Sequence, residues 1–153
     1  MTLNRFAVIS DIHGNRWALE AVLADLKDRS ISEVLNLGDH LYGPLDPAGT
    51  ADILMSNGFH NIMGNQDRII VSPAPEGLDH PTMKYVQSVM NPDQINWLRK
   101  LPFSITVDGD ISLIHGTANQ DDEYLLTGVQ KEGIVLRNSS EVAERIPEDA
   151  SLV

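Results

Sequence analysis

Short, mostly apolar runs alternate with segments of helical spacing along the first half of the chain. Runs at 6–9, 34–37 and 59–63 predict strands, and the first, which is continuously apolar, fits a strand buried on both faces. Between them, apolar residues recur at helical spacing over about 15–27 and 48–56, with Asn15 as the expected N-cap of the first helix. The order strand, helix, strand, helix, strand predicts a parallel sheet with right-handed crossovers.

Proline and glycine punctuate the second half of the chain. A Pro-rich stretch at 72–81 predicts a surface loop, and two short helices are expected over 81–90 and 92–100. Runs at 103–107 and 111–114 flank Asp108-Gly109-Asp110 and predict a hairpin. A helix is expected at 139–145, and residues 150–153 resemble the opening of a strand. Since there is no repeat or linker, residues 1–153 are expected to form a single domain of the α/β class.

Composition narrows the classes of partner. The 153 residues are 42% hydrophobic and 22% charged, as in globular proteins, and 22 acidic against 11 basic residues give a net charge of −11. This sign argues against binding to a nucleic-acid backbone or to an anionic membrane surface. No apolar run reaches the roughly 18 residues of a membrane span, and a signal-peptide pattern is missing, so we expect a cytoplasmic protein without a membrane partner. The chain has no Cys, so any metal must be held by oxygen and imidazole ligands.

Polar side chains that can bind metals follow four of the predicted strands. Asp11 and His13 follow the first strand, Asp39 the second, Asn65 the third, and His115 the second strand of the hairpin. Ligands of open α/β sheets bind outside the carboxyl ends of the strands, so these side chains are expected to converge. Carboxylate, imidazole and amide oxygen suit borderline divalent cations, and a carboxylate can bridge two of them. Two such ions can clamp a phosphate and hold a hydroxide between them.

Each of these residues also has an ordinary structural explanation. Asp11 and Asp39 could be Asx-turn residues that end a strand, His13 and Asn65 precede or follow glycine in turns, and His115 could be a satisfied strand-end residue. Those explanations do not require the residues to recur at successive strand ends, which is what favours a site. The remaining histidines are assigned no chemical role: His40, His60 and His80.

Four segments, in order, carry a resemblance to a known family. They are Asp11-Ile12-His13-Gly14-Asn15, Gly38-Asp39-His40-Leu41-Tyr42-Gly43-Pro44, Gly64-Asn65-Gln66-Asp67 and Leu113-Ile114-His115-Gly116. The chain resembles the calcineurin-like metallophosphoesterases from its start to about Gly116, and the second segment is similar to the small bacterial phosphodiesterase branch. The resemblance implies a four-layer α/β/β/α sandwich of two sheets flanked by helices.

The resemblance also implies a dinuclear metal centre and a hydrolytic activity. Asp11 and His13 would hold the first ion, Asp39 would bridge, and Asn65 and His115 would hold the second. The ions implied are Mn²⁺, with Fe, Zn, Ni and Co as alternatives. A metal-bound hydroxide would attack the phosphorus of a small phosphodiester or phosphomonoester, with Asp39 and Asn65 as the catalytic residues. The enzyme implied is a metal-dependent phosphoesterase.

Two departures from the family pattern qualify this expectation. Many members have a His after the Asn of the third segment, but here Gln66 occupies that position and cannot give up a proton near neutral pH. The family closes with Gly-His-Thr-His, whereas this chain has no His after His115. The fold is therefore expected to be C-terminally incomplete: either the chain is a shortened form, or water fills the vacant ligand positions. The alternative function is a non-catalytic protein-interaction module on the same fold. The sequence leaves the ester and the oligomeric state open.

Overall fold

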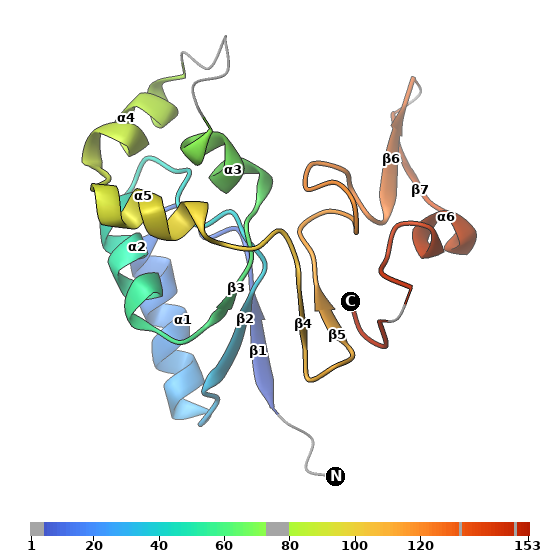
Figure 1. Cartoon of the computed structure of the whole chain (residues 1–153), viewed down its shortest axis with the longest axis horizontal. Coiled ribbons are helices and arrows are strands. Elements are labelled where there is room, and N and C mark those ends of the chain that lie inside the picture. The colour runs from blue at the N-terminus through green and yellow to red at the C-terminus, as the bar shows by residue number, and fades with distance from the viewer. Residues whose placement is uncertain (1–4, 73–79, 132, 149) are drawn as a thin grey trace. The chain divides into compact units, whose positions relative to one another are not determined.

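Residues 5–72, 80–131, 133–148 and 150–153 are described by a computed structural model of the chain (Figure 1). The chain divides into two units, Met1–Pro102 and Phe103–Val153. Both units combine helices with strands, which confirms the predicted α/β class. Within the described residues, no helix has both the length and the apolar composition needed to cross a membrane.

A parallel sheet organises the first unit. Its strands are β1 (Phe6–Ile9), β2 (Glu33–Asn36) and β3 (His60–Asn61), in the order β1-β2-β3. The register pairs Val8 with Leu35 and Leu35 with His60, both in parallel. The strands expected at 6–9 and 34–37 are confirmed to within one residue at either end.

The third strand is shorter than the 59–63 that the sequence predicts. The Ile62 N–H still donates to the Asn36 carbonyl at 3.1 Å, so the segment continues alongside β2. The Met63 N–H instead donates to the Pro102 carbonyl at 2.8 Å. The backbone therefore leaves its hydrogen-bonded ladder with β2 at Met63.

Two helices between the strands were predicted from the apolar spacing. These are α1 (Arg16–Asp28) and α2 (Pro47–Ser56), which lie on the same side of the sheet in Figure 1. Asn15 caps α1 by accepting a hydrogen bond from the Ala18 N–H at 3.1 Å, as expected. Asp46 caps α2 by accepting from the Gly49 N–H at 2.9 Å.

In the described part of this unit, three further helices follow: α3 (Asn65–Val71), α4 (Pro81–Val89) and α5 (Pro92–Arg99). The sequence predicts α4 and α5 but not α3. Residues 73–79 of the predicted Pro-rich loop lie outside the described residues, and Pro81 already belongs to α4. An apolar core joins these helices to α2 and to the loop after β2; its buried members are Leu41, Ala51, Ile70, Met83, Val86 and Leu98.

The residues described in the second unit form two antiparallel hairpins. The first, predicted from the sequence, is formed by β4 (Ile105–Val107) and β5 (Ile111–Leu113). Leu152 pairs with Ile111 in an isolated parallel bridge, in line with the strand opening expected at 150–153. The second hairpin, β6 (Thr127–Gln130) and β7 (Gly133–Leu136), was not predicted. The last helix, α6 (Ser139–Ala143), lies within the predicted 139–145.

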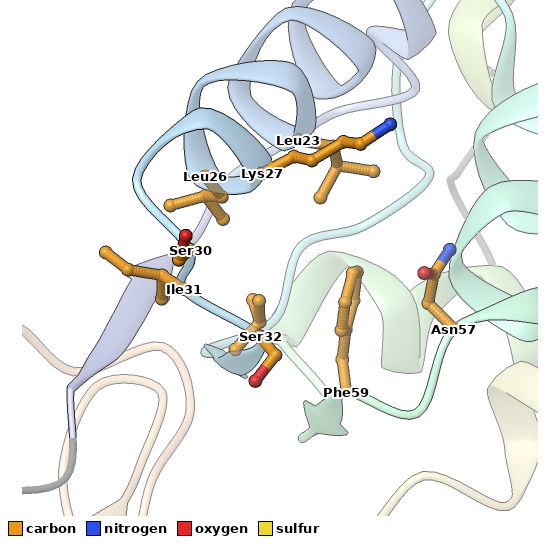
Figure 2. A pocket seen from close by; sticks show the side chains of 9 residues that line it. Leu23, Leu26, Lys27, Ser30, Ile31, Ser32, Asn57 and Phe59 are labelled. Carbon is orange, nitrogen blue, oxygen red and sulfur yellow. The ribbon is translucent and has the colours of Figure 1, made fainter.

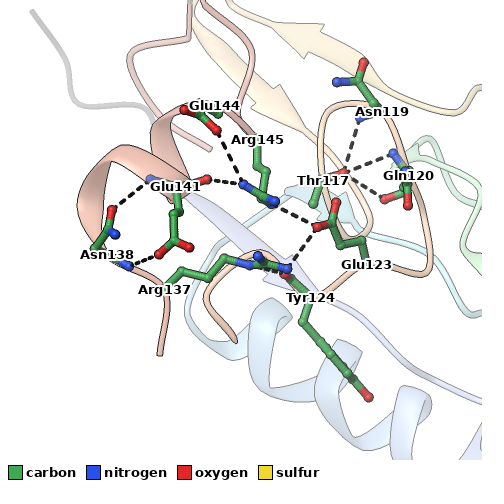
Figure 3. Close-up of polar contacts among 10 residues, drawn as sticks. All are labelled: Thr117, Asn119, Gln120, Glu123, Tyr124, Arg137, Asn138, Glu141, Glu144 and Arg145. Atoms are coloured by element: carbon green, nitrogen blue, oxygen red, sulfur yellow. Dashed lines mark hydrogen bonds and ion pairs between the residues drawn. The ribbon is translucent and has the colours of Figure 1, made fainter. Parts of the chain in front are cut away.

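An ion-pair network ties the loop that follows β5 to the second hairpin and α6 (Figure 3). Glu123 accepts hydrogen bonds from Arg137 Nη2 and from Arg145 Nε, each at 2.9 Å. The Arg145 carbonyl in turn accepts from the Ala118 N–H at 2.7 Å. Thr117 is almost fully buried, and its N–H donates to the Gln120 carbonyl at 2.8 Å. This loop is therefore held by both charge and backbone hydrogen bonds.

Candidate metal centre

The loops that follow β1 and β2 are hydrogen-bonded to each other. The Asp11 N–H donates to the Gly38 carbonyl at 3.0 Å, and the His13 N–H donates to the Asp39 carbonyl at 3.0 Å. The Gly14 N–H continues the series by donating to the His40 carbonyl at 2.9 Å. The parallel pairing of the two strands thus extends into their loops, which places Asp11, His13 and Asp39 beside one another.

These three residues also share an uncommon backbone conformation. Their φ angles are +55° at Asp11, +50° at His13 and +55° at Asp39. The left-handed region is disfavoured for residues with a Cβ, and holding one there costs on the order of 1–3 kcal/mol. Three such residues in two adjacent loops concentrate strain at this point of the fold. Strained residues of this kind cluster at functional sites.

The side chains of Asp11, His13 and Asp39 form one cluster. Each offers a ligand atom, and these atoms all lie within 4.8 Å of one another. Asp39 is 2% exposed, while Asp11 is open to solvent and His13 is partly exposed. Two carboxylates this close repel each other unless a cation lies between them. Carboxylate and imidazole are suitable ligands for a divalent transition metal, so the donor set fits such an ion.

The orientation of the His13 ring supports this assignment. Nδ1 lies 3.2 Å from the Tyr42 carbonyl oxygen, which can only accept, so Nδ1 carries the proton and donates it. In the neutral ring Nε2 then has the free lone pair, and this nitrogen lies 3.5 Å from Oδ1 of Asp11. Metal-binding histidines commonly donate one ring N–H to a carbonyl while the other nitrogen binds the ion. A Cβ on Gly43 would overlap the His13 carbonyl, so glycine is required at that contact.

Asn65 begins α3, and the backbone on either side of it contacts Asp39. The Gln66 N–H donates to Oδ1 of Asp39 at 2.9 Å. A Cβ on Gly64 would overlap both the carboxylate and the backbone nitrogen of Asp39. The start of α3 therefore lies against the second-strand loop, as the strand-end argument requires. Whether the Asn65 side chain binds an ion stays a prediction.

His115 is the one expected ligand that belongs to the second unit. It follows β5 by two residues, is partly exposed, and precedes Gly116, whose φ is +91°. Its place in the metal centre stays a prediction that rests on the sequence.

A buried pair lies beside the site, and sequence reasoning missed the role of one of its members. His40, to which no role was assigned, is fully buried, and its Nδ1 lies 2.6 Å from Oδ2 of the equally buried Asp67. The acidic character of Asp67 in the third segment indicated that it could orient a neighbouring group. Nothing in the sequence indicated that its partner would be His40.

A hollow of about 520 Å³ lies at the other end of the strands (Figure 2). Most of its lining is apolar, including Leu23, Leu26, Ile31, Val34 and Phe59. Its residues lie where β2 begins and just before β3, whereas the cluster lies where the strands end. Because it lacks the cluster residues and any convergent set of acidic groups, we do not assign the chemistry to it.

The fold and the cluster define a class: an α/β protein with a carboxylate–imidazole cluster, suited to a metal ion, at the carboxyl ends of parallel strands. Comparison with known proteins makes this more specific. The model of the calcineurin-like phosphoesterase family matches residues 4–148. The chain belongs to this family, which confirms the resemblance seen in the sequence.

Individual proteins are similar to the chain in sequence or in fold. Over 111 residues the chain is 30% identical to uncharacterized protein MJ0912 of Methanocaldococcus jannaschii, a match that covers 69% of this chain and 45% of that protein. A metallophosphoesterase crystal structure from Sphaerobacter thermophilus is similar with a TM-score of 0.66 and 25% identity, covering 80% of this chain and 51% of that one.

The crystal structure of hypothetical protein PH1004 from Pyrococcus horikoshii shares the fold, with a TM-score of 0.63 and 22% identity over 76% of this chain and 56% of that one. The chain thus spans about half the length of these relatives.

Proposed function

We propose that this chain is a metal-dependent phosphoesterase that hydrolyses a small phosphodiester or phosphomonoester. The observation that carries the proposal is the cluster of Asp11, His13 and Asp39, whose ligand atoms lie within 4.8 Å of one another at the ends of β1 and β2. Family membership supports the same chemistry.

The proposed centre holds two divalent ions, with Mn²⁺ as the first candidate and Fe, Zn, Ni and Co as alternatives. Asp11 and His13 would bind one ion, Asp39 would bridge both, and Asn65 and His115 would bind the other. The bound ions would supply a nucleophile at neutral pH and would neutralise charge on the phosphate. They would also offset the repulsion between the carboxylates and the −11 charge of the chain, which otherwise disfavours an anionic substrate.

The chain's own residues orient this centre. The Tyr42 carbonyl fixes the His13 ring, and the Gln66 N–H fixes one oxygen of Asp39. The Gln66 amide can donate a hydrogen bond but cannot protonate a leaving group near neutral pH. We therefore propose that esters with acidic leaving groups, such as aryl phosphodiesters, are hydrolysed fastest.

Hydrolysis of bis(p-nitrophenyl) phosphate tests the proposal. We expect Mn²⁺ to accelerate release of nitrophenolate by the wild-type chain, and Asp39→Asn to abolish that acceleration. Asp28→Asn is a matched control, because it removes the same charge from an exposed position at the end of α1. It should retain the wild-type response to Mn²⁺.

Two results would count against this function. If the chain binds no divalent metal above background, the metal centre is wrong. If Mn²⁺ binds but no phosphoester is hydrolysed, the chain fits the alternative of a non-catalytic interaction module on the phosphoesterase fold.

A further inference from the structure

A buried carboxylate links the two turns that enclose Asp39. Asp67 lies in the first turn of α3 and is 0% exposed. Its Oδ1 accepts the His40 backbone N–H at 2.9 Å, and its Oδ2 accepts the Gly64 N–H at 3.0 Å. His40 directly follows Asp39, and Gly64 packs directly on Asp39. One side chain thus holds both the residue that follows this proposed bridging ligand and the glycine that packs against it.

The His40 ring gives Asp67 a third donor. Its Nδ1 lies 2.6 Å from Oδ2 of Asp67, and since the carboxylate can only accept, Nδ1 carries the proton. The ring is fully buried and packs edge-on against Trp97 of α5, with the ring centroids 5.6 Å apart. Its Nε2 is buried and has no hydrogen-bond partner among the described residues. The orientation of the ring is therefore set by Asp67 and Trp97.

Burying a carboxylate and an imidazole costs free energy unless the two groups hydrogen-bond to each other. An apolar pair of the same volume could fill the space without that cost. All three hydrogen bonds of Asp67 go to residues that flank Asp39 or its contact Gly64. Replacing a residue that orients a metal ligand without touching the metal typically lowers the metal affinity by about 10- to 100-fold.

From this arrangement, and resting on the proposed metal centre, we infer that Asp67 and His40 form a positioning pair that holds the Asp39 carboxylate in its metal-binding orientation. Neither side chain contacts the ion or the substrate. The pair acts by fixing the turn after β2 against the start of α3, so that the Asp39 carboxylate is pre-oriented before an ion arrives.

Mn²⁺ affinity, measured by titration calorimetry on the intact chain, tests the inference without relying on activity. Asp67→Asn keeps the size of the side chain but places an N–H₂ against donors, so we expect the dissociation constant for Mn²⁺ to rise by about 10- to 100-fold. Val86→Ala is the control, because it creates a cavity at a fully buried α4 position of the core and removes none of these hydrogen bonds. It should lower the melting temperature of the metal-free chain while leaving the Mn²⁺ affinity within about twofold of the wild type.

Two substitutions at His40 separate hydrogen bonding from packing. His40→Asn places an amide N–H₂ near the position of Nδ1 but removes the ring, whereas His40→Phe keeps a ring against Trp97 but removes the donor. A positioning pair predicts tighter Mn²⁺ binding by His40→Asn than by His40→Phe, although His40→Phe should be the more stable protein. A purely structural role predicts that affinity follows stability, with His40→Phe binding better.

These variants distinguish the inference from the proposed function. If the wild-type chain itself does not bind Mn²⁺, the metal centre fails and the inference fails with it. If the wild type binds Mn²⁺ and Asp39→Asn does not, but Asp67→Asn binds like the wild type, the inference alone is overturned. Should Asp67→Asn not fold, as judged by circular dichroism, the two His40 variants decide the question.

Discussion

Three residues at this site have a strained backbone conformation, and their side chains lie close together. Asp11, His13 and Asp39 all have φ angles near +50°, where a Cβ is disfavoured, and their loops are locked by cross-loop hydrogen bonds of 2.9–3.0 Å. These hydrogen bonds hold the two carboxylates and the imidazole close to one another. The hydrogen bonds between the two loops thus offset the free-energy cost of the strained conformation.

Gly64 and Gly58 provide a matched pair of glycine substitutions at this scale. A Cβ at Gly64 would overlap the Asp39 carboxylate and backbone nitrogen, whereas a Cβ at Gly58 meets nothing within 4 Å. We expect Gly64→Ala to abolish measurable Mn²⁺ binding in calorimetry and to lower the melting temperature.

The Gly58→Ala control should bind Mn²⁺ normally. It should also be neutral or more stable by about 0.4–1 kcal/mol, because alanine reduces the entropy of the unfolded chain. If Gly64→Ala binds Mn²⁺ like the wild type, the close packing of α3 on Asp39 does not matter for the ion.

Glu123 should make the stability of the second unit depend on pH. A hydrogen bond from Arg145 holds its pKa below the ordinary value of 4.5, and the charges of Arg145 and Arg137 act in the same direction against the effect of burial. The unfolded chain then binds more protons than the folded one at acidic pH. The stabilisation is therefore complete above pH 4.5 and is lost as the pH falls through the lowered folded pKa.

Urea unfolding of the wild type and Glu123→Gln at several pH values checks this. The wild type should be the more stable near pH 7, and the difference should shrink as the pH falls below about 4.5, the ordinary carboxyl value. Glu144→Gln, at an exposed position of α6's C-terminal cap, should show little difference at any pH. A difference for Glu123→Gln that is constant with pH would contradict the ion-pair account.

Most of the site prediction came from the types of residue that follow the predicted strands. Asp11, His13 and Asp39 were proposed as ligands from their place after strands, because the carboxyl ends of parallel strands lie at one edge of a sheet, and the structure brings the three together. The pairing of His40 with Asp67 could not be identified in this way. It depends on α3 turning back onto the second-strand loop, and that is a tertiary contact without a local sequence signal.

At the scale of elements, the first turn of α1 follows directly from the loop that holds Asp11 and His13. Asn15 accepts the Ala18 N–H, which satisfies one of the unpaired donors at the start of the helix. We expect Asn15→Ala to lower the free energy of unfolding by about 0.5–2 kcal/mol, measured by urea denaturation without metal. A Ser at this position should restore most of the loss, because its hydroxyl can accept the same hydrogen bond. No loss in the alanine variant would show that this cap does not stabilise α1.

Elements with a clear period were predictable, and elements defined by tertiary hydrogen bonds were not. The apolar spacing of α1 and the hairpin around Asp108-Gly109-Asp110 were visible in the sequence. The β6–β7 hairpin was missed because its strands lack alternation. Ile134, Val135 and Leu136 are consecutive apolar residues, and Ile134 and Leu136 are 73% and 82% exposed. The helix α3 was missed because Gly64-Asn65 resembles a simple turn.

For the whole molecule, the proposed centre predicts coupling between metal binding and stability. An ion that binds only the folded chain stabilises it by about 2.7 kcal/mol when its free concentration is one hundred times its dissociation constant. We expect the melting temperature of the wild type to rise with Mn²⁺ concentration. Asp39→Asn should not respond, and Asp28→Asn should respond as the wild type does. An equal rise in all three proteins would indicate non-specific binding.

The most direct test is anomalous diffraction near the manganese absorption edge from crystals of this chain grown with Mn²⁺. Our account predicts two peaks: one bound by Asp11, His13 and Asp39, and a second that shares Asp39 and is bound by Asn65 and His115. A single peak at Asp39 would support the cluster and contradict the second half of the proposed centre. Crystals with manganese elsewhere, and none at Asp39, would contradict the central claim.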